Sequence, residues 1–309
     1  MSDRIEAVGL PANVRAFATL RHGAGTSAAP FDTFNLGNFR DAQGDDPETV
    51  ARNRAELAER FGLPSWPHWL RQVHGTGVVG FDEAALPPPP LAGGEEGLLA
   101  RHGRAGHPNA RRAAPGRTSR GGGLSEADVT HLPAPVADGD MSTPEPEADA
   151  AATSTPGVVL AILTADCLPV VFAAKDGSEI AAAHAGWPGL SAGMLETALA
   201  AMRTPAADVV AWIGPCAGPA RYEVGRNVFD AFVVPDAGAA SAFASTREGH
   251  WLADLPALAR RRLVAAGMGA ANVHGGGLCT ISEPGRFFSH RRDGRSGRIA
   301  TLAWIEPAA

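Results

Sequence analysis

The sequence contains few cysteines, and it lacks ligand pairs such as C-x-x-C or H-x-x-x-H. Its 309 residues include three cysteines, Cys167, Cys216 and Cys279. An odd number without framework spacing indicates reduced thiols and a cytoplasmic protein. No apolar run reaches the roughly 20 residues that span a bilayer. Residues 1–17 lack the basic and apolar regions of a signal peptide. We therefore expect a cytoplasmic location and no membrane partner.

The chain also lacks an excess of positive charge. Its formal net charge is −6 at pH 7, so nothing attracts it generally to nucleic acid or to anionic lipid. Hydrophobic residues make up 45% of the chain, which is ample for a large core in one or two domains. We expect a monomer that acts on a small molecule and does not bind nucleic acid.

The most informative stretch is residues 157–188, GVVLAILTADCLPVVFAAKDGSEIAAAHAGWP. Apolar runs at 158–163, 169–174 and 179–183, each bounded by turn residues, predict buried strands. The second run is expected to return beside the first. Cys167 and His184 then lie at strand ends, where a rigid sheet holds side chains in a fixed relation. A short strand predicted at 68–73 ends in the same way, at His74.

One thiol and two imidazoles form a ligand set for zinc, whose catalytic sites usually use three protein ligands and leave a fourth position open. Spacing alone favours a plainer interpretation, because no pair such as C-x-x-C or H-x-x-x-H fixes the geometry of His74, Cys167 and His184. A single Cys after an apolar run is more often a small buried hydrophobe. The residues by themselves leave both interpretations open.

Five strings occur in order along the chain: QVHG, TADCLPV, HAGW, GPCAGPARYEVG and FFSHRRDGRSGR. With them the chain resembles the bacterial YfiH family, also described as laccase-domain or multicopper polyphenol oxidase proteins. The likeness extends to NLGN at 35–38 and to DDPETVARNRAEL at 45–57. It implies that His74, Cys167 and His184 hold one zinc ion. It also implies a CNF1/YfiH-like layered α/β/β/α sandwich with mixed sheets, and the irregular order of strands and helices likewise favours the α+β class.

The resemblance further implies purine nucleoside chemistry at the metal site. The expected reaction is phosphorolysis of adenosine, inosine or guanosine to the free base and ribose 1-phosphate, with deamination of adenosine at the same site. Zinc lowers the pKa of bound water toward neutrality, which suits deamination. Besides the three ligands, Asp166 is a candidate catalytic residue, either as a general base or as the partner that orients a ligand histidine. Capping a turn is an equal alternative for Asp166.

The substrate-binding residues expected from the resemblance are Asn35, Arg54, Gln72 and Arg291. Arg54 falls on the apolar face of a helix predicted over 45–61. There its planar guanidinium either extends to water or suits phosphate. Arg291 is a candidate for binding an anionic group. Two positions depart from the family pattern: relatives usually carry Arg or Lys where Pro188 stands, and Tyr where His290 stands.

Three other functions stay open. His₂Cys is also the equatorial ligand set of blue copper sites, which would suit oxidation of polyphenols by copper. However, none of the ten histidines is two positions from another, so the His-X-His pairs of a trinuclear copper cluster are missing. A metal-free cysteine hydrolase acting on cell-wall precursors would use Cys167 as nucleophile and His184 or His74 as its base. The last alternative is a non-catalytic protein that recruits a partner through an Arg-rich insertion.

We expect one catalytic domain over residues 1–309, with two interruptions. Residues 82–135 are rich in Arg, Gly and Pro, and such a composition buries too little surface to offset the entropy of ordering. They are predicted to form a disordered insertion. Residues 140–156 are expected to be a shorter low-complexity segment.

Overall fold

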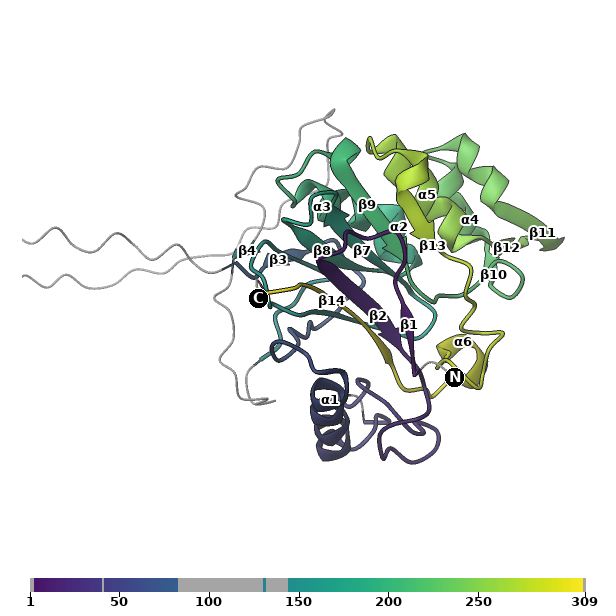
Figure 1. The fold of residues 1–309 in the computed structure, drawn as a ribbon. Helices are drawn as coiled ribbons and strands as arrows, with labels where there is room; N and C mark the ends of the chain where they lie inside the picture. Colours follow the sequence, from purple (N-terminus) through teal and green to yellow (C-terminus); the bar gives the residue numbers. More distant parts are fainter. Residues whose placement is uncertain (1–2, 41, 83–129, 132–143, 308–309) are drawn as a thin grey trace, which may run out of the picture. The chain divides into compact units, whose positions relative to one another are not determined.

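The computed structural model describes residues 3–40, 42–82, 130–131 and 144–307 (Figure 1). Its strands are β1 (Arg4–Glu6), β2 (Val14–Thr19), β3 (Val78–Gly80), β4 (Thr130–His131), β5 (Ala150–Thr153), β6 (Leu160–Thr164), β7 (Leu168–Ala174), β8 (Ile180–Ala185), β9 (Val209–Ile213), β10 (Glu223–Gly225), β11 (Phe243–Arg247), β12 (His250–Ala253), β13 (Val273–Gly275) and β14 (Ile299–Ile305). Its α-helices are α1 (Pro47–Phe61), α2 (Trp187–Ala192), α3 (Met194–Ala200), α4 (Arg226–Val233), α5 (Leu255–Ala265) and α6 (His290–Asp293), and its 3₁₀ helices are η2 (Ala206–Asp208), η3 (Ala237–Ala242) and η4 (Ala270–Asn272). None of these helices is both long and apolar enough to cross a membrane.

The strands form three sheets. The largest has seven strands in the order β13-β9-β7-β8-β5-β3-β4, with both parallel and antiparallel pairs. The second has the order β1-β2-β14-β6 and is antiparallel throughout. A small third sheet, with the order β10-β12-β11, is formed by the residues between β9 and α5 in the sequence.

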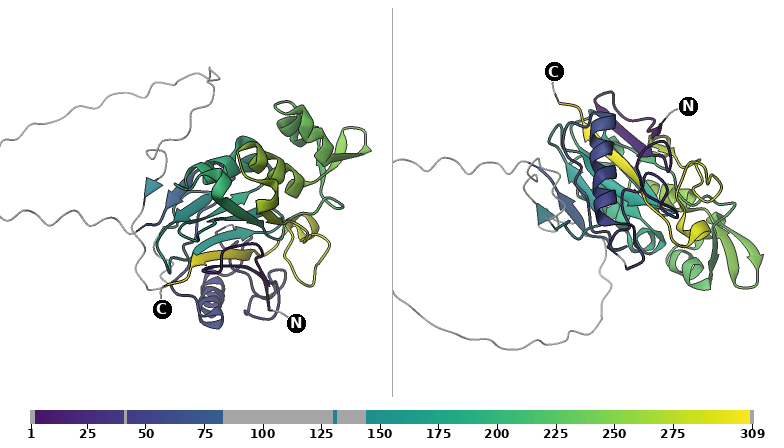
Figure 2. Two further views of the ribbon diagram at one scale, coloured as in Figure 1. Left: turned by 45° about the horizontal axis from the view of Figure 1, so that its top comes forward. Right: turned by 90° about the horizontal axis from the view of Figure 1, so that it is seen from below.

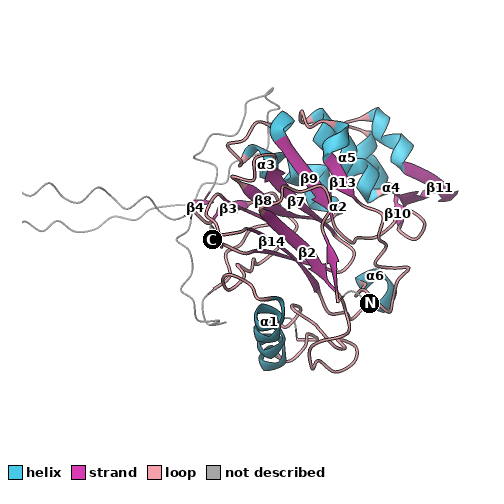
Figure 3. Ribbon diagram, viewed as in Figure 1, coloured by secondary structure: helices cyan, strands magenta, loops and turns pink. Residues whose placement is uncertain are grey.

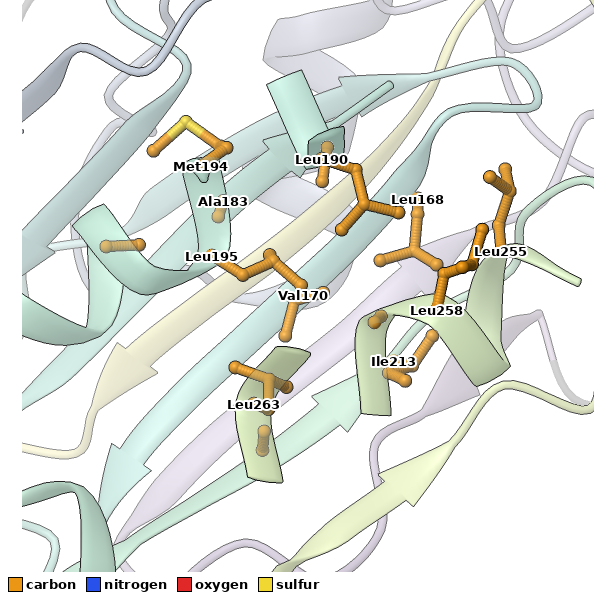
Figure 4. Close-up of a cluster of buried hydrophobic side chains, with 14 of the residues drawn as sticks. Leu168, Val170, Ala183, Leu190, Met194, Leu195, Ile213, Leu255, Leu258 and Leu263 are labelled. Atoms are coloured by element: carbon orange, nitrogen blue, oxygen red, sulfur yellow. The ribbon is translucent and has the colours of Figure 1, made fainter. Parts of the chain in front are cut away.

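The two larger sheets pack face to face, and helices cover their outer faces (Figures 1 and 2). Side chains from both sheets, such as Ile162 of β6 and Val171 of β7, share one buried cluster. On the other face of the seven-stranded sheet, α2, α3 and α5 pack against Leu168, Val170 and their neighbours (Figure 4). Leu57 of α1 packs on the outer face of the four-stranded sheet. The predicted α+β sandwich with α/β/β/α layers and mixed sheets is therefore confirmed, and Figure 3 shows the strands enclosed between helices.

Helix α1 forms where its sequence predicts it. The carboxylate of Asp46 accepts a hydrogen bond from the backbone N–H of Thr49 and caps the helix, and Pro47 occupies the first turn. The helix ends at Gly62, whose φ of 58° is the left-handed conformation that glycine adopts readily. These end signals are local, which is why they could be recognised without knowledge of the tertiary structure.

Two expectations about the central strands are wrong. β7 does not return beside β6, because β6 belongs to the four-stranded sheet and β7 to the seven-stranded one. Residues 68–73 form isolated bridges, at His68 and Arg71, instead of a strand. The helical segment that follows β8 is divided into α2 and α3 at Gly193, which has a φ of 102°.

The two expected interruptions contain ordered strands. Residues 150–153, within the supposed low-complexity segment, form the fully buried strand β5. Alanine side chains suit this position because β5 is covered on both faces and lies between β3 and β8. Apart from Asp82 and β4, the expected insertion at 82–135 lies outside the described residues.

Candidate active site

Cys167 lies where the chain crosses from one sheet to the other. β6 ends at Thr164 and β7 begins at Leu168. The turn between them passes through Asp166, whose φ of 90° is uncommon for a residue other than glycine but is tolerated by short polar side chains. This tight crossing presents the Cys167 thiol between the two sheets.

His184 and His74 reach the same place by different routes. His184 belongs to β8, whose antiparallel pairing with β7 sets it opposite Pro169. This register brings its imidazole beside Cys167, two residues before Pro169. His74 lies in the loop that leads to β3, and its backbone is also left-handed, with a φ of 62°. Sheet register therefore positions one histidine, and a loop positions the other.

The three predicted ligands come together. Their donor atoms all lie within 4.8 Å of one another, and Cys167 Sγ is 3.7 Å from Nε2 of His74. Ligands at about 2.0–2.3 Å from a tetrahedral ion are about 3.3–3.8 Å apart, so small side-chain rotations would close this group around an ion. His184 is 3% exposed whereas His74 is exposed, so one side of the group faces solvent.

Gly186 leaves space beside this group. A Cβ atom there would lie 2.7 Å from Cδ2 of His74 and 3.0 Å from Sγ of Cys167. Its φ of −60° is ordinary for any residue, so the requirement for glycine comes from space. Two imidazoles, one thiol and this cleared volume fit a metal ion that keeps an open coordination position.

Asp149 connects the two histidines, and sequence reasoning missed it. Its carboxylate accepts hydrogen bonds from Nδ1 of His184 at 2.8 Å and from the backbone N–H groups of Val73, His74 and Gly75 at 3.2, 2.9 and 2.7 Å. We call His74, Cys167 and His184 the ligand group. Because Nδ1 of His184 is bonded to Asp149, its Nε2 is left to face the other two members of this group. The only signal in the sequence is that Asp149 precedes a run of small residues able to form a strand.

Charges inside the group favour a thiolate. Burial alone would raise the pKa of the Cys167 thiol, but the adjacent His184 and the hydrogen bonds from both histidines lower it to about 6. Burial would lower the pKa of His184, but the negative Cys167 and the Asp149 carboxylate together raise it to about 9. Without a metal ion these charges favour the thiolate form of Cys167, which is the form that binds metals.

The carboxylate that bonds to Nδ1 of His184 is that of Asp149, whereas Asp166 bonds to two other loops. Its Oδ1 accepts a hydrogen bond from Oγ1 of Thr280 at 2.6 Å. Its Oδ2 accepts hydrogen bonds from Oγ of Ser289 at 3.0 Å and from the backbone N–H of Arg291 at 2.6 Å. Asp166 therefore fastens two distant loops to the residue that precedes Cys167. Its role as a general base stays a prediction.

Two cavities meet at the ligand group. The larger, of about 470 Å³, is lined by Arg40, Arg54, Arg71 and Arg298 among others. The smaller, of about 330 Å³, is lined by Trp187, Tyr222 and Leu255 among others. The residues that line both are His74, Ala165, Cys167 and His290. We call the larger one the basic compartment and the smaller one the aromatic compartment. Cavities of this size suit small molecules.

A further cavity, of about 500 Å³, lies away from this group beside Lys175 and Arg203. Its buried carboxylate, Glu179, already accepts hydrogen bonds from the backbone N–H groups of Arg203 and Thr204. We therefore place the candidate site at the two compartments that share the ligand group.

Arg54 belongs to the wall of the basic compartment. It is 1% exposed, and its guanidinium lies 4.1 Å from the centre of the Trp69 ring. It donates hydrogen bonds to the carbonyl oxygen of Leu36 and to Glu145, both at 2.9 Å. Glu145 also accepts one from the exposed Arg40 at 2.6 Å. Arg54 thus holds the loop of Leu36 and the carboxylate of Glu145, and these in turn position Arg40.

The other predicted substrate residues are placed differently. Gln72 lines the basic compartment, but its amide donates to and accepts from the backbone of Leu163, at 2.8 Å each. Asn35 is fully buried, and its side chain is bonded to Asp45, Gly37 and Arg298. Arg291 is exposed beside the aromatic compartment, with its guanidinium 4.6 Å from the centre of the Tyr222 ring.

Comparisons with known proteins give a consistent result. A family model described as multi-copper polyphenol oxidoreductase laccase matches residues 15–102 and 116–306. A Xylella fastidiosa protein named purine nucleoside phosphorylase is 50% identical over 295 residues, which cover 96% of this chain and 94% of that protein. The Escherichia coli K12 protein named purine nucleoside phosphorylase YfiH is 36% identical over 295 residues, covering 96% and 95% of the two chains.

Solved structures agree with these sequence matches. The crystal structure of a Neisseria meningitidis protein superposes with a TM-score of 0.74 at 36% identity, covering 99% of this chain and 100% of that one. The structure of YlmD from Geobacillus stearothermophilus superposes with a TM-score of 0.73 at 26% identity, covering 99% and 98%. With the motifs, the fold and these matches in agreement, the chain belongs to the YfiH family of multi-copper polyphenol oxidoreductase laccase proteins.

Proposed function

We propose that this protein is a zinc-dependent purine nucleoside phosphorylase that also deaminates adenosine at the same site. The observation that carries the proposal is that a basic and an aromatic compartment share His74 and Cys167, which lie together with His184. Phosphate requires cationic donors, and a purine suits an apolar, aromatic wall. The names of relatives at 36–50% identity support the phosphorolysis part of this proposal.

Each compartment then has a role. Arg40, Arg71 and Arg298 line the side suited to phosphate, and Arg40 and Arg71 pair with Glu145 and Glu147. We propose that Arg54, Gln72 and Asn35 contribute to substrate binding indirectly, because they fix the walls and loops of the basic compartment. Arg291 is proposed to contact the substrate at the aromatic side, next to Tyr222.

Zinc is the proposed metal, held by His74, Cys167 and His184. When bound, it would supply a Lewis acid and an activated water for deamination. Copper oxidation of phenols is less well supported, because no second group of three or more potential ligands occurs among the described residues, and a trinuclear copper cluster needs many more histidines. The proposal also includes a monomer in the cytoplasm, as expected from composition.

The test is a paired incubation of metal-quantified protein with inosine, with and without phosphate, followed by chromatography of hypoxanthine. We expect release that requires phosphate and is lost in Cys167→Ala. Cys279→Ala is the matched control, since Cys279 is also a partly exposed free cysteine and it should retain activity. No release by fully zinc-loaded protein from inosine or adenosine would refute the proposal. A blue absorption band with oxygen consumption on a phenol would favour the oxidase instead.

A further inference from the structure

His290 occupies a position that the proposed function does not yet use. Of the four residues that line both compartments, His74 and Cys167 are proposed metal ligands, and Ala165 has no group that exchanges protons. His290 is the fourth, and its side chain is exposed. An imidazole there borders the space for phosphate and the space for the purine at once.

The backbone around His290 is fixed relative to the ligand group. The residues on either side of it, Ser289 and Arg291, both donate hydrogen bonds to Oδ2 of Asp166, at 3.0 and 2.6 Å. Asp166 directly precedes Cys167. The carbonyl oxygen of His290 also accepts a hydrogen bond from the N–H of Gly294 at 2.8 Å, closing the short helix α6. The backbone that carries His290 is thereby held beside the residues next to Cys167, although the imidazole itself is exposed.

Phosphorolysis needs a proton donor on the purine side. When the bond between C1′ of ribose and N9 of the purine breaks, its electron pair moves into the purine ring, and protonation of N7 stabilises that charge. A side chain that donates this proton typically accelerates such a step by about 10²–10⁴-fold.

The other polar side chains of the aromatic compartment are poorly suited to this step. Burial raises the pKa of the Tyr222 hydroxyl to about 12. Both carboxylate oxygens of Asp166 already accept hydrogen bonds, and an arginine such as Arg291 does not give up its proton. An imidazole, in contrast, gives and takes protons near neutral pH.

We propose that His290 is the general acid that protonates N7 of the departing purine, an inference that rests on the proposed phosphorylase function. The bond from phosphate oxygen to C1′ forms, the C1′–N9 bond breaks, and the proton on the imidazole moves to N7. Hydrogenphosphate brings one proton, which ribose 1-phosphate loses and which returns to the imidazole. Atoms and charge therefore balance over one turnover.

The test compares inosine with 7-methylinosine in the zinc-loaded enzyme. Methylation gives N7 a positive charge in advance, so that the base leaves without a proton. We expect His290→Gln to lower kcat/KM on inosine by about 100-fold or more, and on 7-methylinosine by less than about 10-fold. His290→Tyr should recover part of the activity on inosine, because a phenol can donate a proton. His250→Gln, on β12 of the small sheet, is the matched control and should match the unmodified protein.

The outcomes distinguish a failure of the proposed role of His290 from a failure of the proposed phosphorylase function. Equal losses on both substrates, or no loss on inosine, would overturn the role of His290 while leaving the phosphorylase intact. If the unmodified zinc-loaded protein cleaves neither substrate in the presence of phosphate, the proposed function itself is wrong and the role of His290 is refuted with it. Zinc content and circular dichroism of each variant show that the ligand group and the fold are kept.

Discussion

Replacing Asp149 with Asn should weaken both the fold and the metal site, although it changes a single atom. Asp149 accepts four hydrogen bonds, two at each carboxylate oxygen. Oδ1 receives those from His184 Nδ1 and the N–H of His74, and Oδ2 receives those from the N–H groups of Val73 and Gly75. An amide has one oxygen and one NH₂ group, and the NH₂ group cannot accept. Whichever way the amide turns, two donors lose their partner.

The size of the effect follows from that count. A buried donor without a partner costs about 1–3 kcal/mol, so two cost about 2–6 kcal/mol of unfolding free energy. Loss of the carboxylate behind a ligand histidine typically lowers metal affinity by about 10–100-fold. Both effects should appear together in Asp149→Asn, because the same carboxylate holds the loop of His74 and the ring of His184.

The measurements are urea unfolding of the metal-free protein and competition of zinc against a chromogenic chelator. Asp230→Asn is the matched control, since Asp230 makes an exposed pair with Arg226 on α4, and such pairs contribute about 0–1 kcal/mol. A loss below about 1 kcal/mol in Asp149→Asn, with unchanged zinc affinity, would show that the carboxylate does not organise the site.

Three further predictions follow from the same geometry. Gly186→Ala should lower zinc affinity at least 10-fold with little loss of stability, because the new methyl group would collide with His74 and Cys167. The control is Gly225→Ala, which should leave zinc binding unchanged. Gly225 lies at the start of α4, and its neighbour there is the flexible end of Asn227. Burial lowers the pKa of His68 to about 4, below the value of about 6.5 in an unfolded chain, so the unfolded state takes up the proton first as pH falls. Stability should thus drop by about 2 kcal/mol between pH 7.5 and pH 5 on account of this residue, and metal-free His68→Leu should lose that much less in urea unfolding; equal losses would contradict the assignment. Deletion of residues 86–124 should leave inosine phosphorolysis intact. The reason is that β3 pairs directly with β5 and that Asp82 accepts a hydrogen bond from the N–H of Ser154. Loss of activity in a folded deletion variant would show that the segment has a catalytic role.

The sequence predicted those features whose signals are local. The ends of α1 were recognisable from Asp46, Pro47 and Gly62, and the apolar runs before Cys167 and His184 located two of the central strands. The family motifs indicated that His74 belongs with them, and the structure brings all three side chains together. Their role as metal ligands stays a prediction that the zinc titration tests.

The features that could not be predicted depend on partners far away in the chain. β5 consists of small residues, and only its position between β3 and β8 makes it a strand. For the same reason only the run of small residues that follows it distinguished Asp149 from the other acidic residues in the sequence around it. The separation of β6 and β7 into two sheets is likewise a tertiary property, because their apolar runs alone are equally compatible with a hairpin.

The wide spacing of the ligand group along the chain determines when during synthesis it can exist. His184 follows His74 by 110 positions, and a ribosome adding about 5–20 residues per second needs about 5–20 s to make that interval. Thr164, just before the Cys167 turn, also pairs with Ile299 of β14, which is made after His184. A nascent chain therefore cannot bring the three side chains together until β8 has been made, and the proposed metal ion can be acquired only after that point of synthesis.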